Sequence, residues 1–302
     1  MQIRRADLAD FAYFIEVARH RSFRHAATEL GVTPSTLSHA MRGLEDRLGV
    51  RLLNRTTRSV TLTAAGADLL SSIQTPFEEI SEAAENLNRF RETPAGRVRI
   101  NVLEDAATLI LAPVIPIFVE RYPDVELDIS VNNRLIDVIE SGFDAGVRYG
   151  GTVPEDMIAQ RLSADIRWMA AASPAYLDQF GQPDHPGALS QHRCVGIKLG
   201  NNQIYDWEFE RDGEEATIAV GGHITVDTSH ALISLALNGV GIVYGVEPVL
   251  RPYLDSGQLK PVLPDWAPMG PGCHIYYSSR RQVPTGLRLL IDLIREIKPL
   301  GL

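Results

Sequence analysis

The sequence predicts an α/β protein that begins with a helical domain of the winged helix-turn-helix kind. Three observations carry this prediction. Residues 22–49 indicate two short helices around a Gly-Val turn, residues 50–66 indicate a small β-hairpin, and from Arg97 onwards β-branched segments alternate with amphipathic ones. Such alternation is typical of strands and helices in a mostly parallel sheet covered by helices.

The turn between the first two short helices has the residues that a helix end and a helix start require. Gly31 can adopt the left-handed conformation that ends a helix. Thr33 is a good N-cap, and Pro34 suits the first helical position because its missing N–H would have had no partner there. Apolar residues that we expect to face inward flank this turn at helical spacing: Ala26, Ala27, Leu30, Val32, Leu37, Met41, Leu44 and Leu48.

The outward face of the second helix is polar and rich in hydroxyl groups. It carries Pro34, Ser35, Thr36, Ser38, His39 and Arg42. Short hydroxyl groups, an imidazole and a guanidinium can contact base edges and phosphates. The pattern therefore favours a helix that reads DNA, and the alternative is a plain helical hairpin on the surface of another kind of protein.

The segment that follows indicates a β-hairpin, or wing. Two arginine-bearing stretches flank a Thr-Thr pair and lead into the β-branched alternation of residues 60–63. Arg55 and Arg58 at the tip are placed to meet the sugar-phosphate backbone or a minor groove. A solvated charged turn is the alternative, and for Arg51 the two readings are equally good.

Charge is distributed unevenly along the chain. The 302 residues carry a net charge of −9, which by itself argues against a nucleic-acid partner. Residues 1–65, however, hold ten arginines, no lysine and six acidic residues, a net charge of +4, while the remaining 19 basic and 32 acidic residues give −13. This distribution indicates that only the first part approaches phosphates.

The first 65 residues resemble the DNA-binding domain of LysR-type transcriptional regulators. The resemblance is carried by DLADFAYFIEVARHRSFRHAATELGVTPSTLSHAMRGLEDRLGVRLLNRTTRSVTLTAAG, and it continues in the family's order through APVIPIFVERYPDVELDI, SGFDAGVRYGG, ASPAYL, ALNGVGIVYGVEPVL and GQLKPVLPDW. His39 departs from the pattern, because many relatives have a longer amide or guanidinium side chain there. Together with the residue pattern, the resemblance implies DNA contacts from Ser22, Arg24, Thr33, Pro34, Ser35, Thr36, Ser38, His39, Arg42, Arg55 and Arg58.

Residues 64–91 indicate a helix with a heptad-like apolar seam. Such a seam either docks on a domain of its own chain or pairs with a second copy, and the resemblance implies dimerisation through this linker helix. Pro76 predicts a kink between Ser72 and Pro76, and residues 93–96 predict a hinge. The expected dimerisation residues are Leu70, Ile73, Phe77, Ile80 and Leu87, with Ala84 also in the seam.

By resemblance, the C-terminal part is an effector-binding domain with two α/β lobes joined by two crossing strands, like periplasmic solute-binding proteins. The residue pattern includes a helix expected at 135–141. The expected domains are a winged helix-turn-helix at 1–62, the linker helix at 63–93 and the effector domain at 94–302, with lobe I at 94–165 and 268–302 and lobe II at 166–267.

Ligand sites in such sheets lie at the carboxyl ends of strands, which here means the cleft between the lobes. The candidates are Glu104, Asp105, Ala106, Ala107, Thr108, Asn132, Asn133, Arg148, Tyr149, Lys198, Asp227 and Thr228. Glu104 and Asp105 either cap their own helix or select an effector with an amine, since many relatives have Ser or Thr there. Asn132 and Asn133 form a turn or contact the effector.

Arg148 and Tyr149 stand where we expect the chain to cross between the lobes. Arg148 would either clamp an anion or pair with an acidic residue of the hinge, and Lys198, Asp227 and Thr228 would face it from lobe II. Because the candidate cleft carries both signs of charge, it suits a zwitterion such as an amino acid or a short peptide.

No motif in this sequence indicates an enzyme. Gly239, Gly241 and Gly245 have the wrong spacing for a dinucleotide loop, and they lie between a helix and a strand rather than between a strand and a helix. There is no HExxH, no metal-type His-Cys spacing and no nucleophile elbow. We expect no enzymatic activity, cofactor or metal, although an α/β enzyme with a helical appendage remains the rival class. Cys194 and Cys273 fit apolar fillers in a reduced cytosol better than a disulfide switch.

The N-terminus lacks a signal-peptide pattern, and the best apolar run, LILAPVIPIF, is short and broken by proline. We therefore expect a cytoplasmic protein without a membrane partner, which argues against an exported solute-binding protein. The resemblance implies a homodimer or homotetramer that binds an interrupted palindrome in double-stranded DNA. It also implies that a small-molecule effector closes the cleft and changes the access of RNA polymerase.

Overall fold

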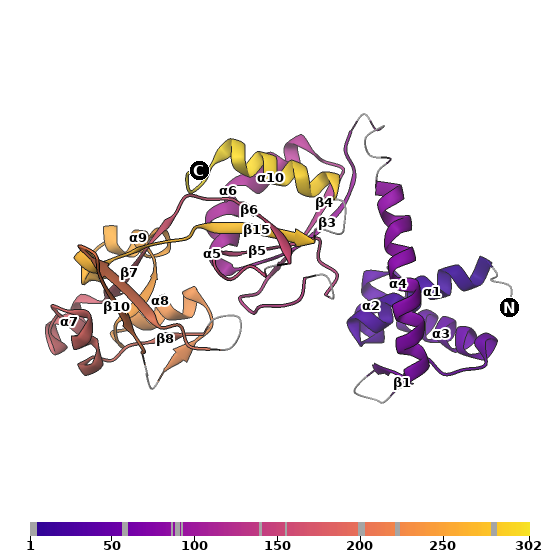
Figure 1. Ribbon diagram of the computed structural model, residues 1–302, viewed down its shortest axis with the longest axis horizontal. Coiled ribbons are helices and arrows are strands. Elements are labelled where there is room, and N and C mark those ends of the chain that lie inside the picture. Colours follow the sequence, from indigo (N-terminus) through magenta and orange to yellow (C-terminus); the bar gives the residue numbers. More distant parts are fainter. Residues whose placement is uncertain are drawn as a thin grey trace. The chain divides into compact units, whose positions relative to one another are not determined.

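The computed structural model describes residues 5–55, 60–85, 87, 91, 93–138, 141–154, 156–198, 203–220, 224–278 and 283–302 (Figure 1). The chain forms two compact units. They are Met1–Arg91 with Glu140–Gly142, and Glu92–Ile139 with Phe143–Leu302. In the described residues, no helix is long and apolar enough to span a bilayer.

The N-terminal unit is a three-helix bundle with a two-stranded antiparallel wing. Its elements are α1 (Arg5–His20), α2 (Phe23–Glu29), α3 (Pro34–Leu48), β1 (Leu53–Arg55) and β2 (Val60–Leu62). One apolar core joins these elements. Its fully buried members include Phe14 of α1, Ala26 of α2, and Leu37, Met41 and Leu44 of α3. The inward positions expected for α2 and α3 are therefore confirmed.

The turn between α2 and α3 has the expected local chemistry. Gly31 has a φ of 64°, and the Thr33 hydroxyl accepts the Thr36 N–H at 3.1 Å as the N-cap of α3. Pro34 occupies the first turn of α3. Gly49 ends α3 with a φ of 70°, in the left-handed region that glycine adopts without a steric penalty.

Helix α4 (Ala64–Glu85) continues the N-terminal unit and runs through Pro76 without interruption. Gly66 allows its first turn to approach Leu52, the residue before β1, because a Cβ at this position would lie 2.1 Å from the carbonyl oxygen of Leu52. Leu70, Ile73 and Phe77 pack against the apolar core of this unit. The expected pairing seam therefore docks in part on its own domain, which is the alternative that the sequence left open.

In the C-terminal unit, lobe I contains a five-stranded sheet in the order β4-β3-β5-β15-β6. Strands β3, β4 and β5 are parallel, and β15, from the far end of the chain, is antiparallel to both of its neighbours. The strands are β3 (Gly96–Val102), β4 (Val125–Val131), β5 (Ala145–Tyr149), β6 (Met157–Arg161) and β15 (Cys273–Ser278).

The helices of lobe I form one core with its sheet. A continuous helical segment follows β3, with a π-helical turn between its two α-helical parts, and it packs with α10 against the sheet (Figure 1). Phe118 and Leu290 are fully buried in this core. The helical elements are α5 (Glu104–Ala106), η2 (Ala107–Leu111), α6 (Ala112–Arg121) and α10 (Thr285–Ile297).

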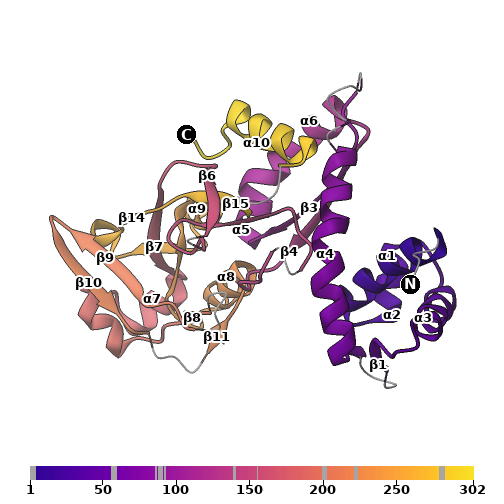
Figure 2. The ribbon, with the colours of Figure 1, turned by 45° about the vertical axis from the view of Figure 1, so that its right-hand side comes forward.

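Lobe II is built around β7, which pairs with β12, β13 and β14. Figure 2 labels β7 and β14. A parallel pair, β8 and β11, and the antiparallel hairpin β9–β10 complete its strands. The strands are β7 (Ile166–Ala172), β8 (Gly196–Ile197), β9 (Trp207–Arg211), β10 (Glu214–Ile218), β11 (Thr225–Val226), β12 (Val243–Val246), β13 (Lys260–Val262) and β14 (Met269–Gly270). The helices are α7 (Pro174–Phe180), η3 (Pro186–Gln191), α8 (Ser229–Leu237), α9 (Glu247–Asp255) and η4 (Pro264–Trp266).

Two expectations about the C-terminal unit are wrong. The pairings of β7 are all antiparallel, so the main sheet of lobe II is not mostly parallel. The helix expected at 135–141 is absent from residues 135–138 and 141, and residues 139–140 lie outside the described part. One local and one longer-range hydrogen bond hold the residue just before this segment: the Arg134 N–H donates to Asn132 Oδ1 at 3.0 Å, and the Arg134 carbonyl accepts from Arg148 at 2.8 Å.

Two segments connect the lobes, one between β6 and β7 and the other between β14 and β15 (Figure 1). They lie side by side, because the Leu162 N–H donates to the Cys273 carbonyl and the Cys273 N–H donates to Ser163 Oγ, each at 2.8 Å. The cleft between the lobes therefore lies next to a doubly connected hinge.

Candidate functional site

The outward face of α3 is a described, exposed polar surface. Thr33, Ser35, Thr36, His39 and Arg42 are exposed, whereas Leu37, Met41 and Leu44 of the same helix are buried. The Thr33 hydroxyl lies 2.8 Å from the hydroxyls of both Ser35 and Thr36. These three hydroxyl groups form a connected cluster at the start of the helix, and Pro34 is exposed beside it.

At the start of α2, Ser22 acts as the N-cap and its hydroxyl accepts the His25 N–H at 3.3 Å. Arg24 is exposed. Helices α1 and α3 are joined by Arg47, which donates to Asp7 at 2.8 Å and to Asp10. The hydrogen bond to Asp10, followed by the one to Asp7, raises the pKa of Arg47. The exposed residues of α3 therefore belong to a helix that ionic contacts hold to α1.

Arg55 is held inside the N-terminal unit. Its guanidinium donates to Glu45 Oε2 at 2.7 Å, lies 3.4 Å from Ser38 Oγ and stands 5.0 Å from the centre of the Phe23 ring. The sequence placed this arginine at the wing tip facing DNA, whereas the structure places it against α2 and α3. Its partner at the tip, Arg58, lies outside the described residues.

Glu45 joins α3 to the wing, and the sequence analysis did not single it out. Besides its ion pair with Arg55, its Oε1 accepts the N–H groups of Leu52 at 2.9 Å and Leu53 at 3.0 Å. One carboxylate therefore fixes both the backbone and an arginine of the wing. A surface hollow beside it is lined by Arg42, Glu45, Asp46, Gly49, Val50, Arg51, Leu53, Asn54 and Arg55.

In the C-terminal unit, a cavity of about 200 Å³ lies at the cleft between the lobes. Its lining residues are Glu104, Val131, Asn132, Asn133, Arg134, Lys198, Asp227 and Thr228. The structure thus brings together six residues that the sequence nominated from four separate segments. Val131 and Arg134 were missed, although both adjoin the two predicted asparagines at the end of β4.

Glu104 reaches across the cleft from lobe I to lobe II. Its Oε2 accepts the backbone N–H of Ser229 at 2.8 Å and that of His230 at 3.4 Å, at the start of α8. Its own N–H donates to Asn133 Oδ1 at 2.9 Å, and Asn133 Nδ2 donates to the Asp227 carbonyl at 2.7 Å. Glu104 is therefore a cap, as one sequence interpretation held, but the helix that it caps belongs to the other lobe.

Asp105 lies behind Glu104 and accepts the Tyr149 hydroxyl at 2.7 Å. Burial raises the pKa of Asp105, against the lowering effect of hydrogen bonds from Tyr149 and Ser229. Burial likewise raises the pKa of Tyr149 well above its ordinary value. Asp105 is a supporting residue beneath the cleft and does not line the cavity.

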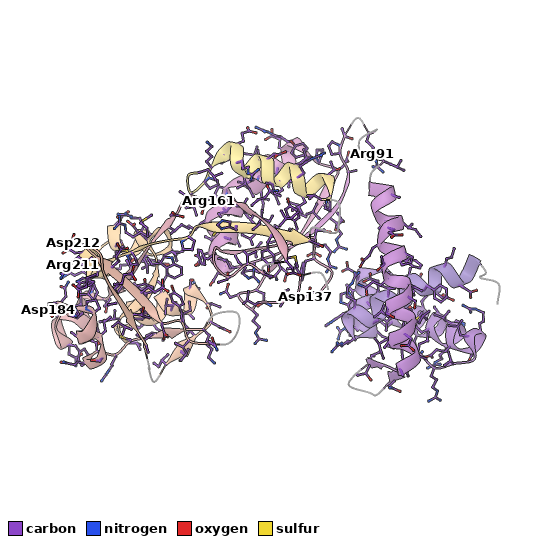
Figure 3. The ribbon with its side chains drawn as sticks, viewed as in Figure 1. Arg91, Asp137, Arg161, Asp184, Arg211 and Asp212 are labelled. Carbon is purple, nitrogen blue, oxygen red and sulfur yellow. The ribbon has the colours of Figure 1, made fainter. Side chains whose placement is uncertain are left out.

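Arg148 is 3% exposed and lies within the lobe I sheet. Its guanidinium donates to the carbonyls of Val147 at 2.7 Å, Asn132 at 3.1 Å and Arg134 at 2.8 Å, and burial lowers its pKa. Among the described residues, it neither lines the cavity nor pairs with an acidic residue of the hinge. The expected crossing point was also wrong, because the chain crosses after Arg161, which Figure 3 labels.

Two further candidates lie outside the cavity wall. Ala106 is 1% exposed and belongs to the lobe I core. The Thr108 hydroxyl lies 3.2 Å from the Glu104 carbonyl, one helical turn earlier. Neither residue lines the cavity, whereas Lys198, Asp227 and Thr228 do so from lobe II.

Other reactive groups offer no second site. Burial raises the pKa of Cys194 and of Cys273 to about 12, so both thiols stay protonated at neutral pH. Among the described residues, no cluster of three or more His, Cys, Asp or Glu side chains could hold a metal ion.

The charged residues Arg211 and Asp212 in Figure 3 lie at the end of the β9–β10 hairpin, where the Arg211 guanidinium lies 4.1 Å from the centre of the Trp266 ring.

Comparison with known families accounts for both units. Residues 8–67 match the family of bacterial regulatory helix-turn-helix proteins of the lysR kind, and residues 91–298 match the LysR substrate-binding domain. The chain belongs to the LysR family of transcriptional regulators. It is a DNA-binding transcription regulator with an effector-binding domain, as the sequence predicted.

Two relatives match this chain along nearly all of their length. This LysR-type chain is 39% identical to the uncharacterized regulator YcaN of Escherichia coli, over 96% of this chain and 95% of that protein. It is 34% identical to the E. coli regulator PgrR, with coverages of 97% and 98%.

Solved structures of LysR-type regulators share the architecture. The Vibrio cholerae virulence activator AphB has a TM-score of 0.70 and 25% identity, covering 96% of this chain and 99% of that one. CrgA of Neisseria meningitidis has a TM-score of 0.59 and 29% identity, with coverages of 98% and 99%.

Proposed function

We propose that this LysR-type regulator recognises its operator through α3 in the major groove. Ser35, Thr36 and His39 would contact base edges, and Arg42 would contact a phosphate. The observation that carries this proposal is the sharp division of α3, with exposed hydroxyl, imidazole and guanidinium groups on one side and buried Leu37 on the other. An exposed arginine makes a strong charge-assisted hydrogen bond to phosphate.

The other predicted DNA contacts have less direct roles in this proposal. Arg55 would act mainly by holding the wing to α3, since Glu45 already pairs with it. Thr33 and Pro34 would orient the start of α3, and Ser22 and Arg24 would contact the DNA backbone from the start of α2. Ser38 would support Arg55, whose guanidinium lies near its hydroxyl.

We further propose that a second copy of the chain pairs with the outer half of α4. Ile80 of α4 is 63% exposed, and Leu87, which lies just beyond the end of α4 at Glu85, is 58% exposed, whereas Leu70, Ile73 and Phe77 pack on their own domain. A homodimer would bind half-sites separated by about 10 bp or a multiple of that spacing, and a homotetramer would bind two such sites. Such an assembly would act in the cytoplasm and alter the access of RNA polymerase to a promoter.

The cleft would bind the effector that modulates this regulator. Arg134 and Lys198 supply positive charge to its wall and Asp227 supplies negative charge. A zwitterion that is small enough for a cavity of about 200 Å³, such as an amino acid, would complement both signs. A thermal-shift screen in which plain carboxylates stabilise the protein and amino acids do not would contradict this part of the proposal.

The experiment that tests operator binding is selection of genomic DNA fragments by the purified full-length protein. We expect enrichment of an interrupted palindrome, and its loss with Arg42→Ala. Arg288→Ala is the matched control, because it removes an exposed arginine from α10 in the other unit. Loss of a phosphate contact should also reduce the salt dependence of binding. Equal enrichment by Arg42→Ala and the control would remove Arg42 from the interface.

A further inference from the structure

Three backbone N–H groups at the N-terminus of α8 find hydrogen-bond acceptors within the protein itself. The first N–H groups of a helix have no partner within the helix, and its dipole favours negative charge there. In the nine-residue α8, the Thr228 hydroxyl accepts the Ala231 N–H at 3.2 Å. The two N–H groups that this cap leaves, those of Ser229 and His230, point at Glu104.

Glu104 supplies a carboxylate to these two amides from the opposite lobe. Its Oε2 lies 2.8 Å from Ser229 N and 3.4 Å from His230 N. Hydrogen bonds from backbone N–H groups to a carboxylate are charge-assisted and stronger than those between neutral groups. The amides that could bind an external anion are therefore already engaged by a side chain of the protein itself.

The position of Glu104 is determined on the lobe I side. Its N–H donates to Asn133 Oδ1 at 2.9 Å, and the same asparagine donates to the Asp227 carbonyl at 2.7 Å. Asp105, the next residue, is held by the Tyr149 hydroxyl at 2.7 Å. The Glu104 carboxylate and the Asn133 amide thus both join lobe I to the start of α8.

We propose that Glu104 is an internal substitute for an anionic ligand: its carboxylate occupies the anion position at the α8 N-terminus and holds the two lobes together without an external carboxylate. This inference deepens the proposed role of the cleft and rests on it. An effector that binds beside Glu104 meets Arg134, Lys198 and Asp227 and finds the α8 amides occupied. The chemical group that it presents to α8 is therefore not a carboxylate.

The test is chemical rescue of the full-length protein. Glu104→Ala removes the internal carboxylate and leaves space for a small anion, so its melting temperature should fall and should recover in acetate or formate relative to chloride at equal ionic strength. The wild type should gain no such anion-specific stabilisation. Glu104→Gln keeps the space filled by a neutral group, so its melting temperature should fall without rescue.

Glu120→Ala is the matched control, because it removes an exposed glutamate from α6 of the same lobe. It should keep the wild-type melting temperature in every anion. Three results would overturn the proposal: no loss of stability in Glu104→Ala, a loss that neither acetate nor formate restores, or equal stabilisation of all four proteins by these anions.

Operator binding by the same preparations keeps this inference separable from the proposed function. If the wild-type protein enriches no genomic fragments, the proposed function is contradicted, and the rescue measurement remains valid. Normal enrichment with no rescue of Glu104→Ala would contradict only the internal-anion inference.

Discussion

Replacing Glu45 tests whether one carboxylate positions the wing against α3. Glu45→Ala leaves the N–H groups of Leu52 and Leu53 without their acceptor, and these residues are 2% and 4% exposed. An unpaired buried N–H costs about 1–3 kcal/mol, so two that share one acceptor and relax together should cost about 2–4 kcal/mol. The ion pair with Arg55, whose two side chains are 24% and 13% exposed, adds about 0.2–1 kcal/mol.

The conservative variant Glu45→Gln separates these two contributions. Its amide oxygen can still accept both N–H groups, so it should lose only about 0.2–1 kcal/mol from the ion pair. Asp46→Ala is the control, because this exposed neighbour on α3 has neither contact.

Hydrogen exchange at increasing urea is the appropriate assay, because all three tryptophans, Trp168, Trp207 and Trp266, lie in the C-terminal unit and would not report on the wing. Exchange of the Leu52 and Leu53 amides should accelerate strongly in Glu45→Ala and only slightly in Glu45→Gln. Equal protection in Glu45→Ala and Asp46→Ala would refute the reasoning.

Two further predictions concern the linker helix and the cysteines. Ile80→Glu should halve the mass measured by light scattering without changing the melting temperature of the N-terminal unit. Leu70→Glu should instead destabilise that unit, because Leu70 packs on its core. An unchanged mass for Ile80→Glu would place the dimer contact elsewhere. Burial raises the pKa of both thiols to about 12. Neither Cys194 nor Cys273 should therefore react with iodoacetamide at pH 8 until urea unfolds the protein. Rapid labelling of the folded protein would contradict their burial.

Local chemistry explains why the turn between α2 and α3 could be predicted. The bonds that define it join residues within five positions of one another, such as the Thr36 N–H to the Thr33 hydroxyl and the Val32 N–H to the Ala27 carbonyl. The conformation of Gly31 and the place of Pro34 depend on their own covalent structure. The inward positions of α3 follow from helical periodicity, which the chain carries in its residue order.

The roles of the charged residues depended on partners that are distant in the sequence. Arg55 was predicted to contact DNA, and the structure adds a partner that the prediction lacked, Glu45, ten positions earlier. Arg148 was expected in the cleft, but it donates to backbone carbonyls of lobe I, including that of Asn132. Periodicity does not show which carboxylate or carbonyl a guanidinium will meet, because an arginine side chain can reach several elements.

The antiparallel sheet of lobe II escaped prediction for a related reason. Alternation of strand and helix patterns reveals the elements and their order, and it allowed the lobe I strands β3, β4 and β5 to be recognised as parallel neighbours. The alternation does not determine strand direction after the chain has crossed to the other lobe, where β7 begins. The direction of pairing there depends on which later strands lie beside β7.

The sequence by itself determined the helix-turn-helix, the α/β order of the C-terminal part and the membership of the LysR family, because these depend on local chemistry and residue order. The tertiary structure decided that Glu104 caps a helix 125 positions further along the chain, in the other lobe. It also decided that half of the linker seam docks on its own domain. Both facts are long-range pairings, and such pairings are set by the packing of whole elements, which no short stretch of sequence contains.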